Sequence, residues 1–457
     1  MTSIADEFLT GSLSDTAPGL SDAGPTSSSP RVWLLDPFCF TPWYSAALAS
    51  SLKDAGAEIR LISGTFSRER TYLQRYGLKA EPGPFQAPEI CKNSPPPIGR
   101  AVRLAEVLLN TRMLARSLHA GGRNLPDILH FQQMPMLNHG LRSDYRLIEA
   151  AQQAGIRVVH TVHNLLPHDT GDRLRTIYVE LYGRVDHLVC HSAGVAQCLR
   201  DDFRIPEHRI SVIPHGPLFA SEHLPSAAEK EQARTRLKLP RKQPIVLLQG
   251  VLATYKGLDV LLEAWKRCVQ TFTHMAGVSP LLLIAGGGPS KLEAEVRQAV
   301  LAAGGSIRAD LGYIPTHRLP DYYAAADLLV YPYRTITTSG ALLTGLTYAK
   351  PIVASRLAPF EEYLTDGENA RLVTPGDPAA LADALTSLLQ DLSPEVRPDL
   401  VPHRSPERRT EPTSNYAHLA HGATHNRCRY ISWAEIGRRT HALYRELALR
   451  KPARYPA

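Results

Sequence analysis

The chain has 457 residues, of which 44% are apolar and 21% are charged, and its formal net charge is +7. At roughly 150 residues per domain this length corresponds to two or three domains, and the composition excludes a collagen-like or wholly disordered chain. No apolar run approaches the ~18 residues of a membrane-spanning helix, and the first 30 residues lack the basic start of a secretory signal. We therefore expect a cytoplasmic protein of several globular domains.

Net charge and cysteine content restrict the possible ligands of the protein only in part. Lys and Arg number 51 against 44 acids, an excess that suits nucleic acid, phosphate-bearing ligands or an anionic membrane surface. Ordinary surface charge explains it equally well, because no block of five or more consecutive Lys or Arg residues is present. The six cysteines show neither a C-x-x-C motif nor zinc-ligand spacing, so we expect free thiols and no metal.

The first half of the chain alternates short apolar strands with helices. Residues 1–30 are rich in Ser, Thr, Gly and Pro, and they predict a disordered leader. From residue 31 a strand–helix–strand rhythm begins, and this rhythm is typical of a parallel sheet with helices on both faces. It predicts a first domain over 31–215. The expected strands are 32–35, 58–62, 127–130, 156–160, 187–190 and 210–213.

The rhythm restarts in the second half and predicts a second domain over 216–392. The Pro-, Arg- and His-rich stretch 393–428 has no periodicity and predicts a flexible insert, whereas Ser432 and Glu435 form a capping box for a last helix within 429–457. The expected class is α/β, with two Rossmann-like, doubly wound domains facing a cleft at the carboxyl ends of their strands. The expected strands of the second domain are 245–248, 281–284, 327–330 and 351–354.

Three loops at strand ends of the second domain carry candidate chemistry. One strand ends at Pro332, and Ser339-Gly340 opens the following helix, whose free N–H groups suit a phosphate, with Arg334 nearby; a plain Ser N-cap is the alternative. A second strand ends at Gly250, before Lys256, a compact donor for a diphosphate if it is not simply solvated. The third loop, 286–288, is a glycine turn and weak evidence alone. Because the three loops lie at strand ends of one sheet, they converge on one crevice, and this strengthens the functional interpretation of each loop.

These stretches occur in an order that resembles glycosyltransferase family 4. The resemblance covers about 31–392 and 430–447. In the second half it rests on Gly250 with Tyr255-Lys256-Gly257, Ala285 to Pro289, Ala324 to Leu328 with Tyr331-Pro332-Tyr333, Ser339-Gly340, and Ala349 to Ala354. In the first half it rests on Thr161 to His168 and Ile213 to Gly216, and Ser432 to Ile436 resembles the closing helix that returns to the first domain.

The resemblance implies a GT-B fold and retaining transfer from a UDP- or GDP-sugar, without a metal or cofactor. Lys256 would hold the donor diphosphate opposite the amides at Ser339, Arg334 would add positive charge, and His163 would face the transferred sugar or acceptor unless it only caps a loop. His130, His168 and His215 are lesser candidates. The donor-binding residues implied in this way are Gly250, Lys256, Gly286, Gly287, Gly288, Tyr313, Ile314, Thr338, Ser339, Gly340 and Ala341. Of these, Tyr313 and Ile314, together with Gly312, would contact the nucleotide base through backbone groups.

The sequence departs from the family at three positions. Ile336 and Thr344 stand where many members have glutamates, and Ala253 stands where many have arginine. A non-catalytic GT-B module that binds a sugar nucleotide or a partner enzyme is therefore an alternative, and an epimerase is a weaker one resting on fold alone. For an active transferase we expect a saccharide or polyprenyl-linked acceptor, peripheral contact at the inner face of the membrane, and no nucleic acid.

Overall fold

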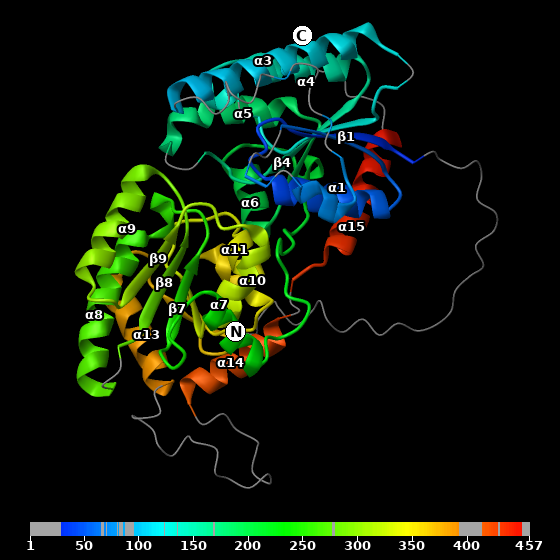
Figure 1. Cartoon of the computed structure of the whole chain (residues 1–457). Coiled ribbons are helices and arrows are strands. Elements are labelled where there is room, and N and C mark those ends of the chain that lie inside the picture. The colour runs from blue at the N-terminus through cyan, green and yellow to red at the C-terminus, as the bar shows by residue number, and fades with distance from the viewer. Residues whose placement is uncertain are drawn as a thin grey trace, which may run out of the picture.

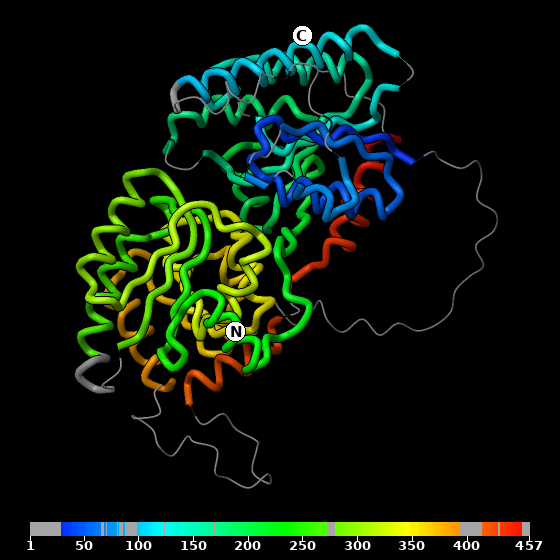
Figure 2. Tube along the Cα trace, in the orientation of Figure 1, coloured from blue at the N-terminus to red at the C-terminus, as the bar shows by residue number. Residues whose placement is uncertain are grey.

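The computed structural model describes residues 29–449, except for 65–67, 70, 80, 82–85, 87–95, 123, 135, 168–169, 277–278, 393–413 and 428–429. The expected leader, up to residue 28, therefore lies outside the described residues, as do His168 and the first part of the expected insert. Two lobes make up the described part (Figure 1), and the tube view traces the chain from the first lobe into the second and back (Figure 2).

The first lobe is a six-stranded parallel sheet in the order β2-β1-β3-β4-β5-β6. Its strands are β1 Arg31–Asp36, β2 Glu58–Ser63, β3 Ile128–Phe131, β4 Arg157–Val162, β5 His187–Cys190 and β6 Ile210–Val212. Its helices are α1 Pro42–Asp54, α3 Pro96–Ala120, α4 Ser143–Gln153, α5 Arg175–Arg184 and α6 Ala193–Asp201. One core packs α3 to α6 on the sheet, and a second core packs α1 against its other face.

The second lobe repeats this plan with the order β12-β11-β10-β7-β8-β9. Its strands are β7 Ile245–Gln249, β8 Leu281–Gly286, β9 Ile307–Leu311, β10 Leu328–Tyr331, β11 Ile352–Ser355 and β12 Ala370–Val373. Its helices are α7 Ala227–Arg236, α8 Leu258–Ala276, α9 Ser290–Ala302, α10 Leu319–Ala325, α11 Gly340–Leu346, α12 Ala358–Glu361 and α13 Pro378–Asp391. Separate cores lie on the two faces of the sheet. The expected fold of two doubly wound parallel sheets is confirmed.

Burial explains why these segments form central parallel strands. Every residue of β3, β4, β8 and β10 is buried, so helices cover both faces of each strand. Such strands tolerate unbroken apolar runs such as Leu281–Ile284, because neither side faces water. The carboxyl ends of all strands in one sheet lie at one edge, so the loops that follow them gather there.

The carboxyl-terminal segment differs from expectation in one respect. Residues within the expected flexible insert form α14, Asn415–Asn426. Leu419 is buried in the core that α8 and α13 share, and the Tyr416 hydroxyl donates to the Asp327 carbonyl at 3.0 Å. The prediction of an insert without structure is therefore wrong for α14. Its sequence shows only weak helical periodicity, and packing against α13 stabilises the helix instead.

The last helix, α15 (Trp433–Leu449), lies against α1 of the first lobe. A Cβ at Gly437 would overlap the Ser51 carbonyl oxygen, so the two helices cross at close range. The Tyr444 hydroxyl lies 2.5 Å from His130 Nδ1, and Arg157 Nε donates to the Leu447 carbonyl at 3.3 Å. The end of the chain thereby completes the core of its first domain.

Candidate functional site

Glycine loops at the ends of β7 and β8 form the floor of the candidate donor site. The Gly250 amide donates to the Ala285 carbonyl at 3.0 Å. Gly286 has φ +145°, and a Cβ there would overlap the Gly250 carbonyl oxygen. A Cβ at Gly287 would come within 2.7 Å of Gly312 Cα, and one at Gly288 would overlap the Leu252 carbonyl oxygen. These glycines are thus required for the loops to pack together, which leaves their backbones open to a ligand.

Lys256 ends a short 3-10 turn, Thr254–Lys256, directly above this floor. Its Nζ lies 5.3 Å from the centroid of the buried Tyr333 ring, a cation–π distance. A Cβ at Gly250 would come within 3.0 Å of the same Nζ. No carboxylate among the described residues pairs with Lys256, and burial lowers its pKa. Lys256 is thus a half-buried cation beside an aromatic ring, and its ammonium is available to an anion.

The start of α11 faces the same floor. Ser339 caps this helix, because its Oγ accepts from the Leu342 amide at 3.2 Å. Within the described part of the chain, the amides of Gly340 and Ala341 have no acceptor. Ala341 Cβ lies 3.8 Å from where a Cβ at Gly250 would be. Lys256 and the start of α11 therefore flank one point over Gly250.

Arg334 and Thr338 lie in the β10–α11 loop, and the side chain of each already bonds to another protein group. The Arg334 guanidinium pairs with Asp259 at the start of α8, and its amide donates to the Tyr255 carbonyl at 2.7 Å. The charge of Arg334 is therefore partly neutralised by Asp259, and the expected contact of Arg334 with the donor diphosphate stays a prediction. The Thr338 hydroxyl donates to the Thr337 carbonyl at 2.8 Å.

Glu69, from the first domain, meets the loop expected to bind the nucleotide base. The Tyr313 hydroxyl and the Thr316 hydroxyl each donate to its carboxylate at 2.6 Å, and Arg75 Nη2 lies 3.3 Å away. Burial opposes ionisation, but the bonds from Thr316 and Tyr313 outweigh it and lower the pKa of Glu69. Ile314, beside Tyr313, packs against the second-domain core. Sequence reasoning missed Glu69, since no local pattern links it to residues 244 positions away.

The first domain contributes His163, which directly follows β4. Its Nε2 lies 3.0 Å from the Gln132 side-chain oxygen, and its Nδ1 lies 3.4 Å from His191 Nε2. Its carbonyl accepts from the Thr337 hydroxyl at 2.7 Å, which ties the β4 loop to the β10–α11 loop. His163 is thereby placed beside the interface of the two domains, and its contact with a sugar stays a prediction.

The hydrogen-bond partners also fix the proton on this histidine. The Ile213 carbonyl can only accept, so His191 Nδ1, 2.9 Å away, donates to it. The Gln132 side-chain oxygen likewise only accepts, so His163 Nε2, 3.0 Å away, donates to it. Burial, with neighbouring His191 and His215, holds the pKa of His163 well below its usual value. His163 is therefore a neutral imidazole near pH 7.

An aromatic cluster surrounds these imidazoles. The Tyr44 ring lies 4.8 Å from His163, 4.9 Å from His215 and 5.3 Å from Trp433 of α15, measured between centroids. His215 also lies close to the start of α11, 3.6 Å from where a Cβ at Gly340 would be. Burial lowers the pKa of both His130 and His215 to about 3. The two act as packed, neutral parts of the first domain.

Two cavities lie beside the loop that follows β4. One, of about 420 Å³, is lined by both domains, including Asn164, Arg175 and Ile336. The other, of about 210 Å³, is lined by first-domain residues that include Asn138, His163 and Asn164. Ile336 lies in the wall of the first of these cavities, and Thr344 is buried in α11.

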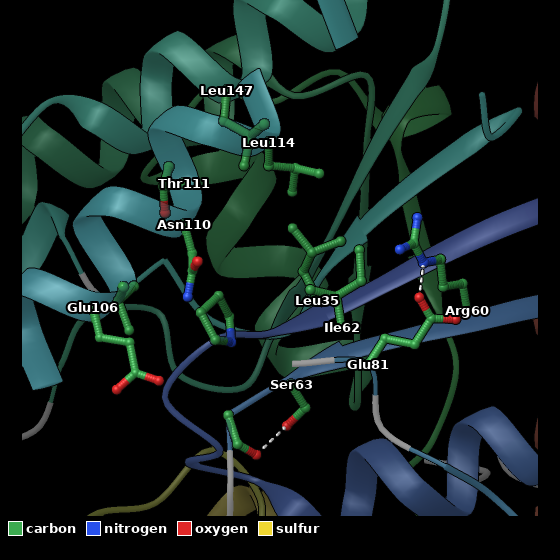
Figure 3. A pocket seen from close by; sticks show the side chains of 13 residues that line it. Leu35, Arg60, Ile62, Ser63, Glu81, Glu106, Asn110, Thr111, Leu114 and Leu147 are labelled. Atoms are coloured by element: carbon green, nitrogen blue, oxygen red, sulfur yellow. Dashed lines mark hydrogen bonds and ion pairs between the residues drawn. The ribbon is translucent and has the colours of Figure 1, made fainter. Parts of the chain in front are cut away.

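A third cavity, of about 90 Å³, lies at the carboxyl ends of β1 and β2 under α3 (Figure 3). Leu35, Ile62, Leu114 and Leu147 line it, and the ion pair between Arg60 and Glu81 lies to one side. Its apolar wall suits a non-polar part of a ligand.

Among the residues that the structure describes, no three His, Cys, Asp or Glu side chains are grouped to hold a metal ion. None of the helices in this part of the chain has both the length and the apolar character needed to cross a bilayer.

Comparison with known proteins agrees with this geometry domain by domain. Residues 43–216 match the family model described as Glycosyltransferase Family 4, and residues 243–391 match that of the Glycosyl transferases group 1. Each domain is therefore similar to a glycosyltransferase domain, and the chain has the GT-B fold. The first domain is similar to the family 4 domain, and the second is similar to the group 1 domain.

Curated relatives and solved structures extend the likeness. The chain is 28% identical to D-inositol 3-phosphate glycosyltransferase of Acidothermus cellulolyticus, over 52% of this chain and 56% of that protein. It is 25% identical to the enzyme of the same name from Corynebacterium urealyticum, over 52% and 58%. The chain thus spans just over half the length of these relatives.

Among solved structures, Anabaena HepE in complex with UDP and glucose superposes with a TM-score of 0.68 at 15% identity, over 91% of this chain and 100% of that one. The sucrose-phosphate synthase of Thermosynechococcus elongatus gives 0.63 at 18%, over 92% and 99%. At these identities the likeness concerns the fold.

Proposed function

We propose that the protein transfers a sugar, with retention, from a UDP- or GDP-sugar to a saccharide or polyprenyl-linked saccharide in cell-surface polysaccharide synthesis. The observation that carries the proposal is the unpaired Lys256 ammonium, which faces the start of α11 across Gly250. A departing diphosphate gains negative charge, and a preorganised cation with free amides stabilises that charge without needing a metal. The complex of Anabaena HepE with UDP and glucose is consistent with such a donor.

The other substrate would approach from the first domain. The cavities beside His163 and Ile336 offer polar groups for a saccharide, and the apolar cavity under α3 suits a lipid part of the acceptor. In a front-face retaining reaction the leaving phosphate accepts the acceptor proton, so a neutral His163 orients groups and no protein base is required. We place the reaction at the cytoplasmic face of a membrane.

The test combines donor binding with turnover. Purified protein is incubated with UDP- and GDP-sugars and candidate acceptors, and nucleotide release and the anomeric configuration of the product are measured. Removal of one charge-assisted contact of ~1.5–3 kcal/mol predicts that Lys256→Ala weakens nucleotide binding about ten- to a hundredfold. Lys266→Ala, an exposed lysine on α8, is the matched control. Equal affinity in both variants would remove Lys256 from the donor site, and a product with inverted configuration would contradict retention.

A non-catalytic module is the second candidate. Ile336 and Thr344 favour it, because neither can supply the carboxylates that many relatives have at these positions. Nucleotide binding without sugar transfer or donor hydrolysis, across all donors and acceptors tried, would support this candidate.

A further inference from the structure

The outward face of α3 is apolar although nothing in the described part of the chain covers it. Exposed fractions reach 55% for Ile98, 38% for Leu109 and 42% for Met113. These residues, with Val102 and Ala105, are spaced by three or four positions and so share one side of the helix. The opposite side, with Val107 and Leu118, is buried on the sheet. A helix that is apolar on both sides is normally covered on both.

Cations without acidic partners border this face. Arg112 and Arg116 of α3 line a groove of about 440 Å³ together with Arg146 of α4. In the described part of the molecule no ion pair involves these three arginines. The carboxylate in the same groove, Glu149, already pairs with Arg184 at 2.6 Å. Like charges four positions apart on a helix repel, so an anionic partner would stabilise the pair on α3.

A polar group in the same groove has no protein partner. Ser143, in the first turn of α4, lines the groove, and its hydroxyl is buried without a hydrogen bond among the described residues. Arginine guanidinium groups and a free hydroxyl are the donors that phosphate oxygens accept from. The groove and the apolar face adjoin, because Arg112 and Arg116 belong to both.

The position of the face leaves the catalytic cleft free. Figure 1 shows α3 along the outer edge of the first domain, on the side away from the second domain. A surface covering α3 would therefore not obstruct the loops around Lys256 and His163.

We propose that this face, with Ile98, Leu109 and Met113 at its centre and Arg112, Arg116 and Arg146 beside them, docks on an anionic phospholipid bilayer. The apolar side chains enter the headgroup boundary while the arginines meet lipid phosphates, which is how interfacial helices bind. The biological sense of this docking rests on the proposed function, since a lipid-linked acceptor is reached from the bilayer surface. The binding itself does not depend on that function.

The test is sedimentation with vesicles of phosphatidylcholine alone or mixed with phosphatidylglycerol. The protein is expected to bind the anionic vesicles, and added salt is expected to weaken the binding. Arg112→Gln with Arg116→Gln should weaken binding roughly 25-fold, at about fivefold per basic residue. Leu109→Gln with Met113→Gln should weaken it at least about tenfold. Leu301→Gln with Lys291→Gln, exposed on α9 of the second domain, are matched controls expected to bind like the wild type.

Two parallel measurements keep the outcomes distinct. Nucleotide release in free solution should be the same in the α3 variants and the wild type. An inactive protein that still binds anionic vesicles would defeat the proposed function and support the docking face. The docking proposal is overturned if the wild type ignores anionic vesicles, if the arginine variant binds undiminished, or if light scattering shows a dimer that the Leu109 and Met113 variant dissociates.

Discussion

Single residues in the donor site act through close packing rather than through special chemistry. Gly257 follows Lys256 with φ +66°, and a Cβ at that position would overlap the Pro332 carbonyl oxygen. The lysine is thereby fixed in direction, since the residue after it can be only glycine without displacing the end of β10.

This packing makes Gly257→Ala a sharp test. We expect a loss of more than ~2 kcal/mol of unfolding free energy together with weaker nucleotide binding, because the left-handed conformation and the overlap both oppose a side chain. Gly304→Ala is the control, since Gly304 has φ +54° but open space around it and should lose only about 1 kcal/mol. Chemical denaturation measures both. Similar losses in the two variants would show that the Pro332 contact does not matter.

At the scale of elements, Glu69 joins a first-domain loop to the β9–α10 connection of the second domain. Its two 2.6 Å bonds to Tyr313 and Thr316 hold the expected base-binding loop toward the first domain. The Thr316 amide adds a third bond at 3.3 Å. One carboxylate thus joins the two domains through three hydrogen bonds.

Removing this contact should affect donor binding more than the chemical step. Glu69→Ala is expected to raise the donor KM about tenfold, the value of one to two charge-assisted bonds, with a smaller change in kcat. Because the pKa of Glu69 is lowered, the contact is complete at neutral pH and is lost as the pH falls through that lowered pKa. Small-angle scattering should show a more open molecule. Glu207→Gln, an exposed first-domain acid paired with Arg200, is the control. An unchanged KM would separate Glu69 from donor binding.

Part of the fold and of the candidate site can be predicted from the sequence alone. Strands such as Leu281–Gly286 are predictable, because unbroken apolar runs between glycine turns have few other structures. The site loops are predictable for the same reason, since Gly250 and Gly286 mark strand ends. The edge strand β9 was not predicted, because its residues Arg308 and Asp310 look like a polar loop. The Glu69 contact and the Tyr44 cluster depend on residues far apart in sequence, which leave no periodic signal.

At the scale of the whole molecule, buried histidines are concentrated in the first domain. Burial lowers the pKa of His160 and His191 to about 4 and that of His130 and His215 to about 3, and His163 is shifted in the same direction. Unfolded histidine has a pKa of about 6.5. The unfolded chain therefore binds more protons than the folded one wherever the pH lies below about 6.5.

Because the folded first domain binds fewer protons at these histidines than the unfolded chain does, we expect the domain to lose stability as the pH falls. Each histidine costs about 1 kcal/mol of stability between pH 7 and about pH 5.5. Two buried carboxyls oppose this, because burial raises the pKa of Asp144 to about 7 and also raises that of Asp36, so folding takes up protons there. The five histidines outnumber the two carboxyls, so the balance is a net loss of stability as the pH falls.

Calorimetry with hydrogen exchange would check this prediction. The first domain should melt at a lower temperature at about pH 5.5 than at neutral pH, with exchange rising first in β3 and β4, which carry His130 and His160. His160→Gln should reduce the pH dependence, because one group that must stay neutral is removed. A melting temperature that does not change with pH, or earlier exchange in the second domain, would mean that the histidines become protonated without loss of the fold. Their burial would then not be what limits the stability of the enzyme in acid.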